Sequence, residues 1–306
     1  MLNIGILGAG RMGKIRVKAC KQLGLNISFI YDEKNIEKDP LFNNIKIINE
    51  VKDINLDEID VLFVCTPPFS HNDEIVLNAI KKKINIFIEK PFSNSYENSN
   101  KLYKEFKSNN TSGYIAFMNL QRKNIKKLIS LKNEGKIIGL TSNWICKEYG
   151  VDWWKNDKLS GGNIVEQGCH FISLHLFLGG DIEWVFADSN KKKSAYSIMM
   201  KHKNNTFSNF IYSSSGEDKY IDFKIMMTDG LIRLNSWDLN IDGVGAYKNI
   251  ENNIELADEI FKNEVVYFLE NIYNKSNYTS LENALSTQKI IDAIKKSIIT
   301  GKKIYI

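Results

Sequence analysis

The feature that most constrains this chain is a glycine pattern directly after its first apolar segment. Residues 4–7 are apolar, and the motif G-A-G-R-M-G follows at residues 8–13. A G-x-G-x-x-G motif between a strand and a helix allows a tight turn, close approach of the backbone to a pyrophosphate, and close helix–strand packing. Free N–H groups at the helix N-terminus attract the anion. The motif predicts a dinucleotide-binding loop in which the cofactor contacts are Gly8, Gly10, Arg11, Met12 and Gly13.

A carboxylate follows this loop at the spacing typical of such sites. Asp32 stands 19 residues after Gly13, at the end of the apolar segment 27–31. There it can accept hydrogen bonds from the ribose hydroxyls of NAD and repel the 2′-phosphate of NADP. The positive charge of Lys34 weakens that preference. We expect NAD(H) in preference to NADP(H); the alternative is a structural glycine turn followed by an ordinary turn aspartate.

The order of apolar segments predicts two domains. Before residue 118, continuous apolar strands alternate with helices, which is typical of a parallel sheet covered on both faces. Between residues 182 and 241, strand-like runs follow one another without helices, the last of them at 237–241, and this indicates an antiparallel sheet. Helices are expected near 264–273 and 281–300. We expect an α/β fold: a doubly wound Rossmann domain in residues 1–120, then an α+β domain in residues 121–306 for substrate binding and oligomerisation.

Composition excludes several classes of protein. The 306 residues suit two domains, and 43% hydrophobic with 25% charged residues is ordinary for a soluble globular protein. The N-terminus is typical of a strand and not of a signal peptide, and no apolar run approaches the roughly 18 residues that span a bilayer. The lysine runs at 81–83 and 191–193 lack interleaved aromatics, so we expect no nucleic-acid partner. Four scattered cysteines indicate a reducing cytoplasm, without a disulfide framework or zinc site.

Three further segments occur at characteristic places. T-P-P at 66–68, with His71, follows the apolar run 61–65, and E-K-P at 89–91 follows the apolar run 84–88. E-Q-G-C-H at 166–170 lies in the second domain. Together with the loop at 8–13, these segments resemble the glucose–fructose oxidoreductase and inositol dehydrogenase family (Gfo/Idh/MocA). The likeness extends over nearly the whole chain, and E-K-P is its most specific element.

The resemblance implies roles for individual residues. The T-P-P loop would border the cofactor, and the lysine of E-K-P would lie beside the nicotinamide and the reacting oxygen. The histidine of the second-domain motif would act as acid/base. A looser match places two residues of the segment after 118 at the border of the active site. The residues so implicated are Thr66, Pro67, His71, Glu89 and Lys90 for the cofactor, Lys90 and His170 for catalysis, and Asn119 and Arg122 for the substrate.

The residues themselves support this chemistry. Lys90 ends a parallel strand, where ligands bind, and its ammonium could stabilise a developing alkoxide. The alternative for Lys90 is a surface ion pair with Glu89. Glu166 and His170 share a helix face, so Glu166 could orient a catalytic His170. A buried structural pair is the alternative, and a zinc pair would need further ligands that the sequence does not supply, so we expect no metal.

Two tryptophans and two histidines lie outside these assignments. Trp153 and Trp154 could stack on a sugar ring or belong to a core. His175 stands among apolar residues and is expected in a core or interface, whereas His202 stands between lysines and is expected at the surface.

Two departures from the family pattern leave the substrate open. Glu166 and Ser173 occupy positions where the family usually has aspartate. The expected reaction is hydride transfer between nicotinamide and a secondary alcohol or ketone of a sugar, sugar derivative or cyclitol. The alternatives are reduction of a C=N or C=C bond, and a non-catalytic nucleotide-binding protein. The partners we expect are a small-molecule substrate and further copies of the chain, as a homodimer or homotetramer through the antiparallel sheet, but no nucleic acid and no membrane.

Overall fold

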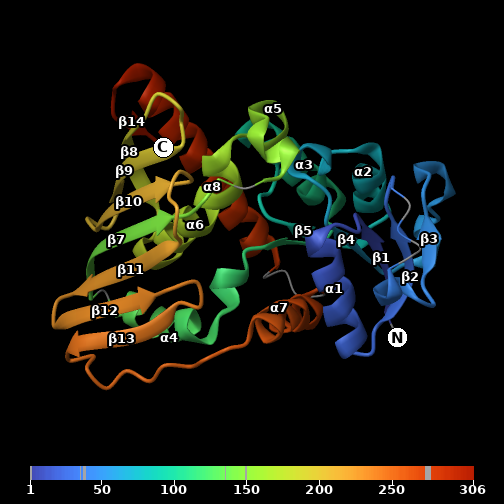
Figure 1. The fold of residues 1–306 in the computed structure, drawn as a ribbon, viewed down its shortest axis with the longest axis horizontal. Helices are drawn as coiled ribbons and strands as arrows, with labels where there is room; N and C mark the ends of the chain where they lie inside the picture. The colour runs from blue at the N-terminus through green and yellow to red at the C-terminus, as the bar shows by residue number, and fades with distance from the viewer. Residues whose placement is uncertain (1, 35, 37–38, 135, 149, 273–276) are drawn as a thin grey trace. The chain divides into compact units, whose positions relative to one another are not determined.

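The computed structural model describes residues 2–34, 36, 39–134, 136–148, 150–272 and 277–306 (Figure 1). The chain forms two compact units. The first unit contains Met1–Met118 and Leu256–Leu285, and the second contains Asn119–Glu255 and Ser286–Ile306.

The first unit is built on a six-stranded parallel sheet in the order β3-β2-β1-β4-β5-β6. Its strands are short and almost entirely buried, because helices cover both faces, and this explains their continuous apolar sequences. The strand order reverses between β1 and β4, and ligands of such sheets bind outside the carboxyl ends of the strands at that point. The strands are β1 (Asn3–Leu7), β2 (Asn26–Tyr31), β3 (Lys46–Ile48), β4 (Val61–Val64), β5 (Asn85–Glu89) and β6 (Gly113–Ala116).

Helices from both ends of the chain complete this unit. In Figure 1, α7 lies beside α1, and Val265 and Phe268 of α7 belong to the same apolar core as Phe63 and Phe87 of the sheet. The helices are α1 (Arg11–Gln22), α2 (Glu74–Lys81), α3 (Tyr96–Asn109), α7 (Ala257–Asn271) and the start of α8 (Asn277–Thr300). Single 3-10 turns occur at Pro40–Phe42, Val51–Asp53, Leu56–Glu58 and Pro68–Ser70.

The returning helix corrects the predicted domain division. We expected residues 121–306 to form the second domain, and the chain does leave the first unit after Met118. Residues 256–285 nevertheless belong to the first unit, because the apolar side chains of α7 complete its core. Residue 273, the predicted end of that helix, lies outside the described residues.

The second unit contains an eight-stranded sheet in the order β13-β12-β11-β7-β10-β9-β8-β14. Every neighbouring pair is antiparallel except β7 and β10. Helix α6 packs against β7 and β10 on one face, where Leu140, Trp144 and Phe210 are fully buried. The strands are β7 (Ile137–Ile145), β8 (Ile182–Ser189), β9 (Ala195–His202), β10 (Phe207–Ser213), β11 (Tyr220–Met227), β12 (Gly230–Asn235), β13 (Asn240–Gly245) and β14 (Ile304–Tyr305).

The helical segments of the second unit are mostly short. They are α4 (Lys123–Asn133), α5 (Asp157–Ser160) and α6 (Cys169–Gly179), the remainder of α8, 3-10 turns at Met118–Gln121 and Asp152–Lys155, and a π-helical turn at Ile164–Gly168. In the part of the chain that the structure describes, no helix has both the length and the apolar character required to cross a membrane.

Two local predictions were wrong. A strand was expected at 237–241, but β13 begins at Asn240, because Ser236 and Leu239 have φ values of 62° and 51° that a strand does not tolerate. His202 was expected at the surface, but it points inward from β9 and is fully buried. His175 lies in the core as expected, with Nε2 2.7 Å from the Ser142 hydroxyl.

Candidate active site

Two glycines of the loop at residues 8–13 are required by the protein itself. Gly8 has φ +89°, and a Cβ there would lie 2.9 Å from the Cys65 carbonyl oxygen. A Cβ on Gly13 would lie 2.0 Å from the Gly8 carbonyl oxygen. The tight turn and the close contact of helix with loop therefore account for both glycines without any ligand.

Gly10 differs, because among the described residues nothing beyond its chain neighbours occupies the space beside it. A Cβ added there would meet no atom within 4 Å, and the residue has an ordinary φ of −66°. Gly10 is the N-cap of α1, where no side chain caps the helix and no acidic residue lies in the first turn. The free N–H groups and the dipole of α1 thus face open space at the switch point of the sheet. A pyrophosphate fits this cradle in both charge and space.

Asp32 is fixed at the edge of the same loop. Its Oδ2 accepts a hydrogen bond of 2.8 Å from the Ala9 N–H, and its Oδ1 accepts one of 2.9 Å from the Lys34 N–H. The carboxylate therefore joins the end of β2 to the glycine loop. Its place next to the loop is the one that hydrogen bonding to an adenosine ribose requires.

His71, a predicted cofactor contact, lies among backbone groups of the protein itself. The ring is fully buried, with Nδ1 3.2 Å from the Phe92 carbonyl oxygen and Nε2 3.0 Å from that of Thr66. Burial lowers the pKa of His71, and the hydrogen bonds to the carbonyl oxygens of Phe92 and Thr66 oppose that shift. His71 thus connects the loops that follow β4 and β5.

Glu89 and Lys90 have different surroundings although they are adjacent. The Glu89 carboxylate is buried and bound by Arg16 of α1, with Nε 2.6 Å from Oε1. Glu89 was predicted to contact the cofactor, and within the chain its carboxylate pairs with Arg16. Lys90, in contrast, is half-buried at the carboxyl end of β5. Thr66 and Pro67 follow the neighbouring strand β4 and are also half-buried.

In the second unit, Glu166 and His170 lie where a π-helical turn passes into α6. Both side chains are buried, with exposed fractions of 2% and 5%. The prediction assumed a regular α-helix, whereas Glu166 belongs to the wider turn Ile164–Gly168 and His170 to α6. Such π-helical turns occur frequently at functional sites.

Aromatic rings surround His170, and sequence reasoning did not find them. The Trp144 ring of β7 stacks on the imidazole with centroids 5.6 Å apart and planes at 19°. Trp237, from the turn before β13, meets the imidazole edge-to-face at 6.5 Å. The ammonium of Lys219 lies 3.9 Å from the Trp237 ring centre. Because these residues come from separate strands and loops, no local motif joins them in the sequence.

Arg122 and Asn119 support the turn that carries Trp237. The guanidinium of Arg122 donates to the carbonyl oxygens of Trp237 at 2.9 Å and Asp238 at 3.1 Å, and to Asn119 Oδ1 at 2.9 Å. Arg122 and Asn119, the predicted substrate contacts, are both buried and hold this turn from inside the unit.

Trp153 and Trp154 lie in the second unit on the 3-10 turn Asp152–Lys155. Both are half-buried, and their rings meet edge-to-face with centroids 5.6 Å apart. Neither ring is part of a fully buried core, so the two alternatives for this pair stay open.

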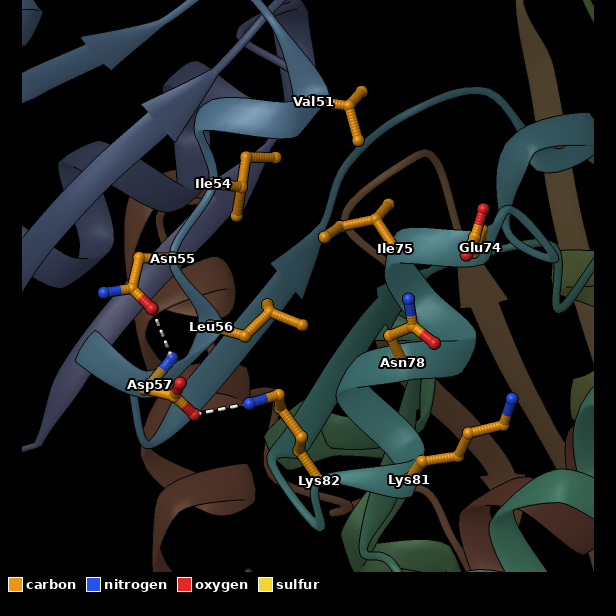
Figure 2. Close-up of a pocket in the computed structure, with 10 residues that line it drawn as sticks. All are labelled: Val51, Ile54, Asn55, Leu56, Asp57, Glu74, Ile75, Asn78, Lys81 and Lys82. Atoms are coloured by element: carbon orange, nitrogen blue, oxygen red, sulfur yellow. Dashed lines mark hydrogen bonds and ion pairs between the residues drawn. The ribbon is translucent and has the colours of Figure 1, made fainter.

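A cavity of about 540 Å³ in the first unit lies apart from the predicted residues (Figure 2). It lies between residues 51–57 and α2, where Figure 2 shows the apolar side chains of Ile54, Leu56 and Ile75. Asp57 and Lys82 form an ion pair at one end. None of the predicted site residues lines this cavity. Among the described residues, no cluster of His, Cys, Asp or Glu side chains is suited to hold a metal ion.

Comparison with known protein families assigns both parts of the chain to described domains. Residues 2–117 match the model described as "Oxidoreductase family, NAD-binding Rossmann fold", and residues 123–233 match the GFO/IDH/MocA C-terminal domain. The chain belongs to the Gfo/Idh/MocA oxidoreductase family. The family named from the motifs is therefore confirmed.

Curated relatives within the Gfo/Idh/MocA family are distant. The chain is 25% identical over 193 residues to an uncharacterized oxidoreductase of Streptococcus pneumoniae, covering 60% of this chain and 52% of that protein. It is 24% identical over 202 residues to myo-inositol 2-dehydrogenase of Thermotoga maritima, covering 62% and 58%. It is 27% identical over 180 residues to 2,7-anhydro-N-acetylneuraminate hydratase of Escherichia coli, covering 54% and 46%. The matches span about half the length of these relatives.

Solved structures of similar fold cover the whole chain. An NAD binding oxidoreductase from Klebsiella pneumoniae superposes with a TM-score of 0.85 at 14% identity, covering 100% of this chain and 99% of the other. Levoglucosan dehydrogenase in complex with NADH and levoglucosan gives 0.84 at 17% identity, covering 100% and 99%. At these identities the likeness concerns the fold, and it confirms the predicted pair of parallel and mainly antiparallel sheets.

Proposed function

We propose that this chain is an NAD(H)-dependent dehydrogenase or reductase that acts on a secondary alcohol or ketone of a sugar, sugar derivative or cyclitol. The observation that carries the proposal is the open cradle at Gly10, bounded by the fixed carboxylate of Asp32. The cradle offers N–H groups to a pyrophosphate, and Asp32 favours a free ribose 2′-hydroxyl over a 2′-phosphate.

Two residues, Lys90 and His170, are the groups that we propose for the proton chemistry. Bound nicotinamide supplies or accepts the hydride. Lys90, at the carboxyl end of β5, donates a hydrogen bond to the reacting oxygen and stabilises negative charge that develops there. His170 accepts the hydroxyl proton during oxidation and returns it during reduction, and Glu166 supports its ring.

The surroundings of His170 favour a ring-shaped, hydroxyl-rich substrate. The half-buried Trp237 ring offers an aromatic face beside the imidazole, and such faces suit the C–H surfaces of sugars and cyclitols. The relative named myo-inositol 2-dehydrogenase and the neighbour solved with levoglucosan support this class for the present chain.

We further propose that the chain forms a homodimer or homotetramer through the open face of the second unit's sheet. Apolar side chains are exposed on this face of adjacent strands, among them Phe186, Met199, Phe207 and Ile211. Exposed apolar side chains gathered in this way are typical of a protein interface. A second copy of the same chain is the partner we propose for it.

The test of the function is a search for hydride transfer with a substrate panel. Polyols and sugars are offered with NAD, and ketones, imines and enones are offered with NADH, while the absorbance of reduced nicotinamide is followed. Turnover of a polyol that is lost in Lys90→Ala and His170→Ala supports the proposal. Turnover of the imine or enone alone would replace it with C=N or C=C reduction, and absence of NADH binding would leave a non-redox role for the fold.

A further inference from the structure

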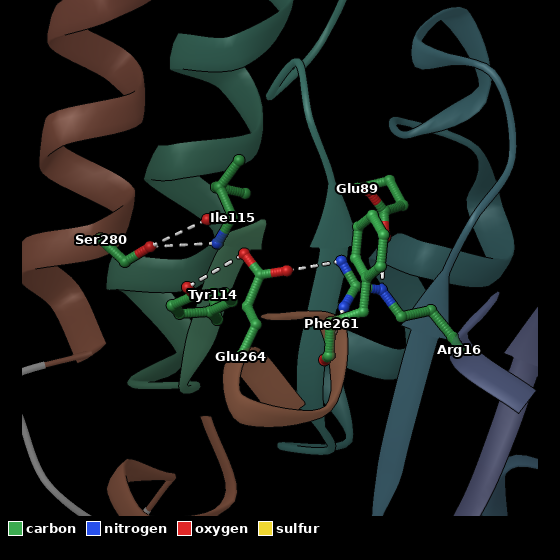
Figure 3. A network of polar contacts seen from close by, with 7 residues as sticks. All are labelled: Arg16, Glu89, Tyr114, Ile115, Phe261, Glu264 and Ser280. Atoms are coloured by element: carbon green, nitrogen blue, oxygen red, sulfur yellow. Dashed lines mark hydrogen bonds and ion pairs between the residues drawn. The ribbon is translucent and has the colours of Figure 1, made fainter. Parts of the chain in front are cut away.

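A buried ionic cluster joins four elements of the first unit (Figure 3). Arg16 of α1 donates from Nε to Glu89 of β5 at 2.6 Å and from Nη2 to Glu264 of α7 at 2.6 Å. Its Nη1 donates to the Phe261 carbonyl oxygen at 3.2 Å, and Tyr114 of β6 donates to the other oxygen of Glu264 at 3.3 Å. Every polar atom of the guanidinium thus has a partner inside the unit.

The cluster is costly to bury, which raises the question of its role. The side chains of Arg16 and Glu264 are fully buried, and that of Glu89 nearly so. Buried ion networks are weak evidence for stability, since the cost of removing charges from water can exceed their attraction. Burial raises the pKa of Glu264 to about 7, against the opposing effect of Arg16. An apolar contact between α1 and α7 would hold the helices together at less cost.

The position of the cluster points to the site. Arg16 lies three residues after Gly13, on the helix whose N-terminus forms the phosphate cradle. Glu89 is the last residue of β5 and directly precedes Lys90. The Arg16–Glu89 ion pair therefore connects the element that carries the cradle to the strand end that carries Lys90.

Lys90 is held on its other side by a separate contact. His71 lies within hydrogen-bond distance of the carbonyl oxygens of Phe92 and Thr66, so it links the segment after Lys90 to the loop after β4. The ion pair of Glu89 with Arg16 precedes Lys90 in the chain, and the contact of His71 with Phe92 follows it. The backbone at Lys90 is thereby fixed relative to both loops at the carboxyl end of the sheet.

We propose that Arg16 is a positioning residue that sets the place of Lys90 relative to the cradle of α1, by holding the carboxylate of Glu89. This role rests on the proposed function, because Lys90 acts there on the reacting oxygen. Glu264 and Tyr114 complete the cluster from the far side of Arg16 and tie its position to α7.

The geometry requires arginine in particular. Nε and Nη2 reach two carboxylates from one rigid plane, while the guanidinium carbon lies 4.5 Å from the ring centre of Phe87 and 5.2 Å from that of Phe261. A lysine ammonium is a point charge that neither presents this fork nor stacks between rings in the same way. Arg16→Lys therefore retains the charge and removes the positioning.

The experiment compares Arg16→Lys and Arg16→Met with a matched control. Lys18→Met breaks an ion pair with Asp258 between the same helices, but both partners of that pair are about half exposed. Three measurements are made on each folded protein: the acetylation rate of Lys90 by peptide mass spectrometry without cofactor, the Kd for NADH, and the steady-state kinetics (kcat and KM) with a substrate from the panel. The melting temperature checks folding.

We expect the Arg16 variants to change the acetylation rate of Lys90 by about fivefold or more, because the surroundings of the amine differ. We expect kcat to fall about 100-fold with little change in KM, since small displacements of a catalytic group cost that much. Lys18→Met leaves all three measurements unchanged. A lower melting temperature with unaltered acetylation and kcat would overturn the proposal and leave a purely structural cluster.

A charge-free variant keeps the test decisive if Arg16→Met does not fold. Arg16→Met combined with Glu89→Gln and Glu264→Gln leaves no uncompensated buried charge. The proposal predicts a folded protein in which Lys90 acetylation is altered as in Arg16→Lys. If no Arg16 variant folds, the cluster is a folding requirement and the proposal is overturned. If wild type binds no NADH, the proposed function fails, while the acetylation rates still report on the positioning.

Discussion

The residues of the phosphate loop are required for different structural reasons. Gly8 and Gly13 satisfy constraints within the chain, whereas Gly10 borders open space. Asp32 holds the loop through Ala9, and in the proposed function its carboxylate also binds a ribose. The sequence could predict the tight turn at Gly8 and the close packing at Gly13, because the spacing of a strand, a turn and a helix determines them locally.

Asp32 gives the first prediction. Asp32→Ala removes both the acceptor for the Ala9 N–H and the charge, so NADH binding should weaken by at least about tenfold, the loss expected for a charged hydrogen bond. Asp32→Asn keeps an acceptor for Ala9 and removes the charge, so its preference for NADH over NADPH should fall while the loop keeps its structure. Fluorescence titration with both cofactors measures this. An unchanged ratio of the two affinities in Asp32→Asn would contradict discrimination by charge.

His170 gives the second prediction. His170→Ala should lower kcat by roughly 100-fold to 10,000-fold, the usual worth of a general acid/base, and leave the Kd for NADH within about threefold of wild type. Steady-state kinetics and NADH titration measure the two effects. The control is His175→Gln in the core. We expect this variant to lose stability, but not to lower kcat while leaving the Kd for NADH unchanged. Equal activity of His170→Ala and wild type would remove His170 from the chemistry.

Other residue roles could not be predicted, because they depend on partners far away in the sequence. Glu89, His71 and Arg122 stand in or near the right motifs, yet each is buried and bound by groups that local spacing does not reveal. Trp144 and Trp237 belong to no motif, and only the packing of β7, α6 and the turn before β13 brings them to His170.

At the scale of elements, the strands of both sheets follow the predicted pattern. A strand that is buried on both faces is apolar throughout, whereas a strand that is buried on one face alternates apolar and polar residues. The turn at residues 236–239 is the informative exception. Its positive φ angles occur at a serine and a leucine, neither of which favours that backbone conformation, and the buried Arg122 holds its carbonyl oxygens.

This turn gives the third prediction. Trp237→Ala should raise KM for a cyclic polyol about tenfold, because a stacking surface beside His170 is lost, while Trp237→Phe should restore most of it. We expect the fold to be retained, because the contacts of Arg122 with the turn involve only its backbone oxygens. Circular dichroism checks this. If KM is the same in both variants and wild type, Trp237 is a packing residue only.

Helix α7 gives the fourth prediction, through Glu264. Burial raises its folded-state pKa from the ordinary 4.5 to about 7. The folded protein therefore holds a proton that the unfolded chain releases, and this contribution to stability is present below pH 4.5 and lost as pH rises through about 7. Between pH 4.5 and about 7, the unfolding free energy of the wild type should therefore decline as pH rises. In Glu264→Gln this decline should be less steep, by at most the slope that the release of one proton contributes. Denaturant unfolding at several pH values measures it, and identical slopes in both proteins would contradict a raised pKa.

At the scale of the whole molecule, the return of residues 256–285 to the first unit could not be read from the sequence. The helix was predicted near the correct residues, but amphipathicity does not say which core a helix completes. The apolar contacts of Val265 and Phe268 and the ion pair of Glu264 decide it.

Assembly gives the fifth prediction. Phe186 and Met199 are paired across β8 and β9 on the open sheet face, and each is more than 40% exposed. Phe186→Lys with Met199→Lys should shift the protein to monomers in sedimentation velocity, because charges in an apolar interface are costly to desolvate. Ile299→Lys changes an apolar residue that is 80% exposed on α8 and serves as the control. A wild-type monomer would contradict the proposed interface.

The central claim is tested most directly by titrating NADH, with fluorescence detection, into wild type and Gly10→Ala side by side. Apart from the chain neighbours of Gly10, no atom of the described residues lies within 4 Å of an added methyl group, so Gly10→Ala should cost at most about 1 kcal/mol of stability as an N-cap change. The account predicts saturable binding to wild type and binding at least about tenfold weaker to Gly10→Ala, since the methyl group enters the place of the pyrophosphate. No binding to wild type, or equal binding to both proteins, would contradict it.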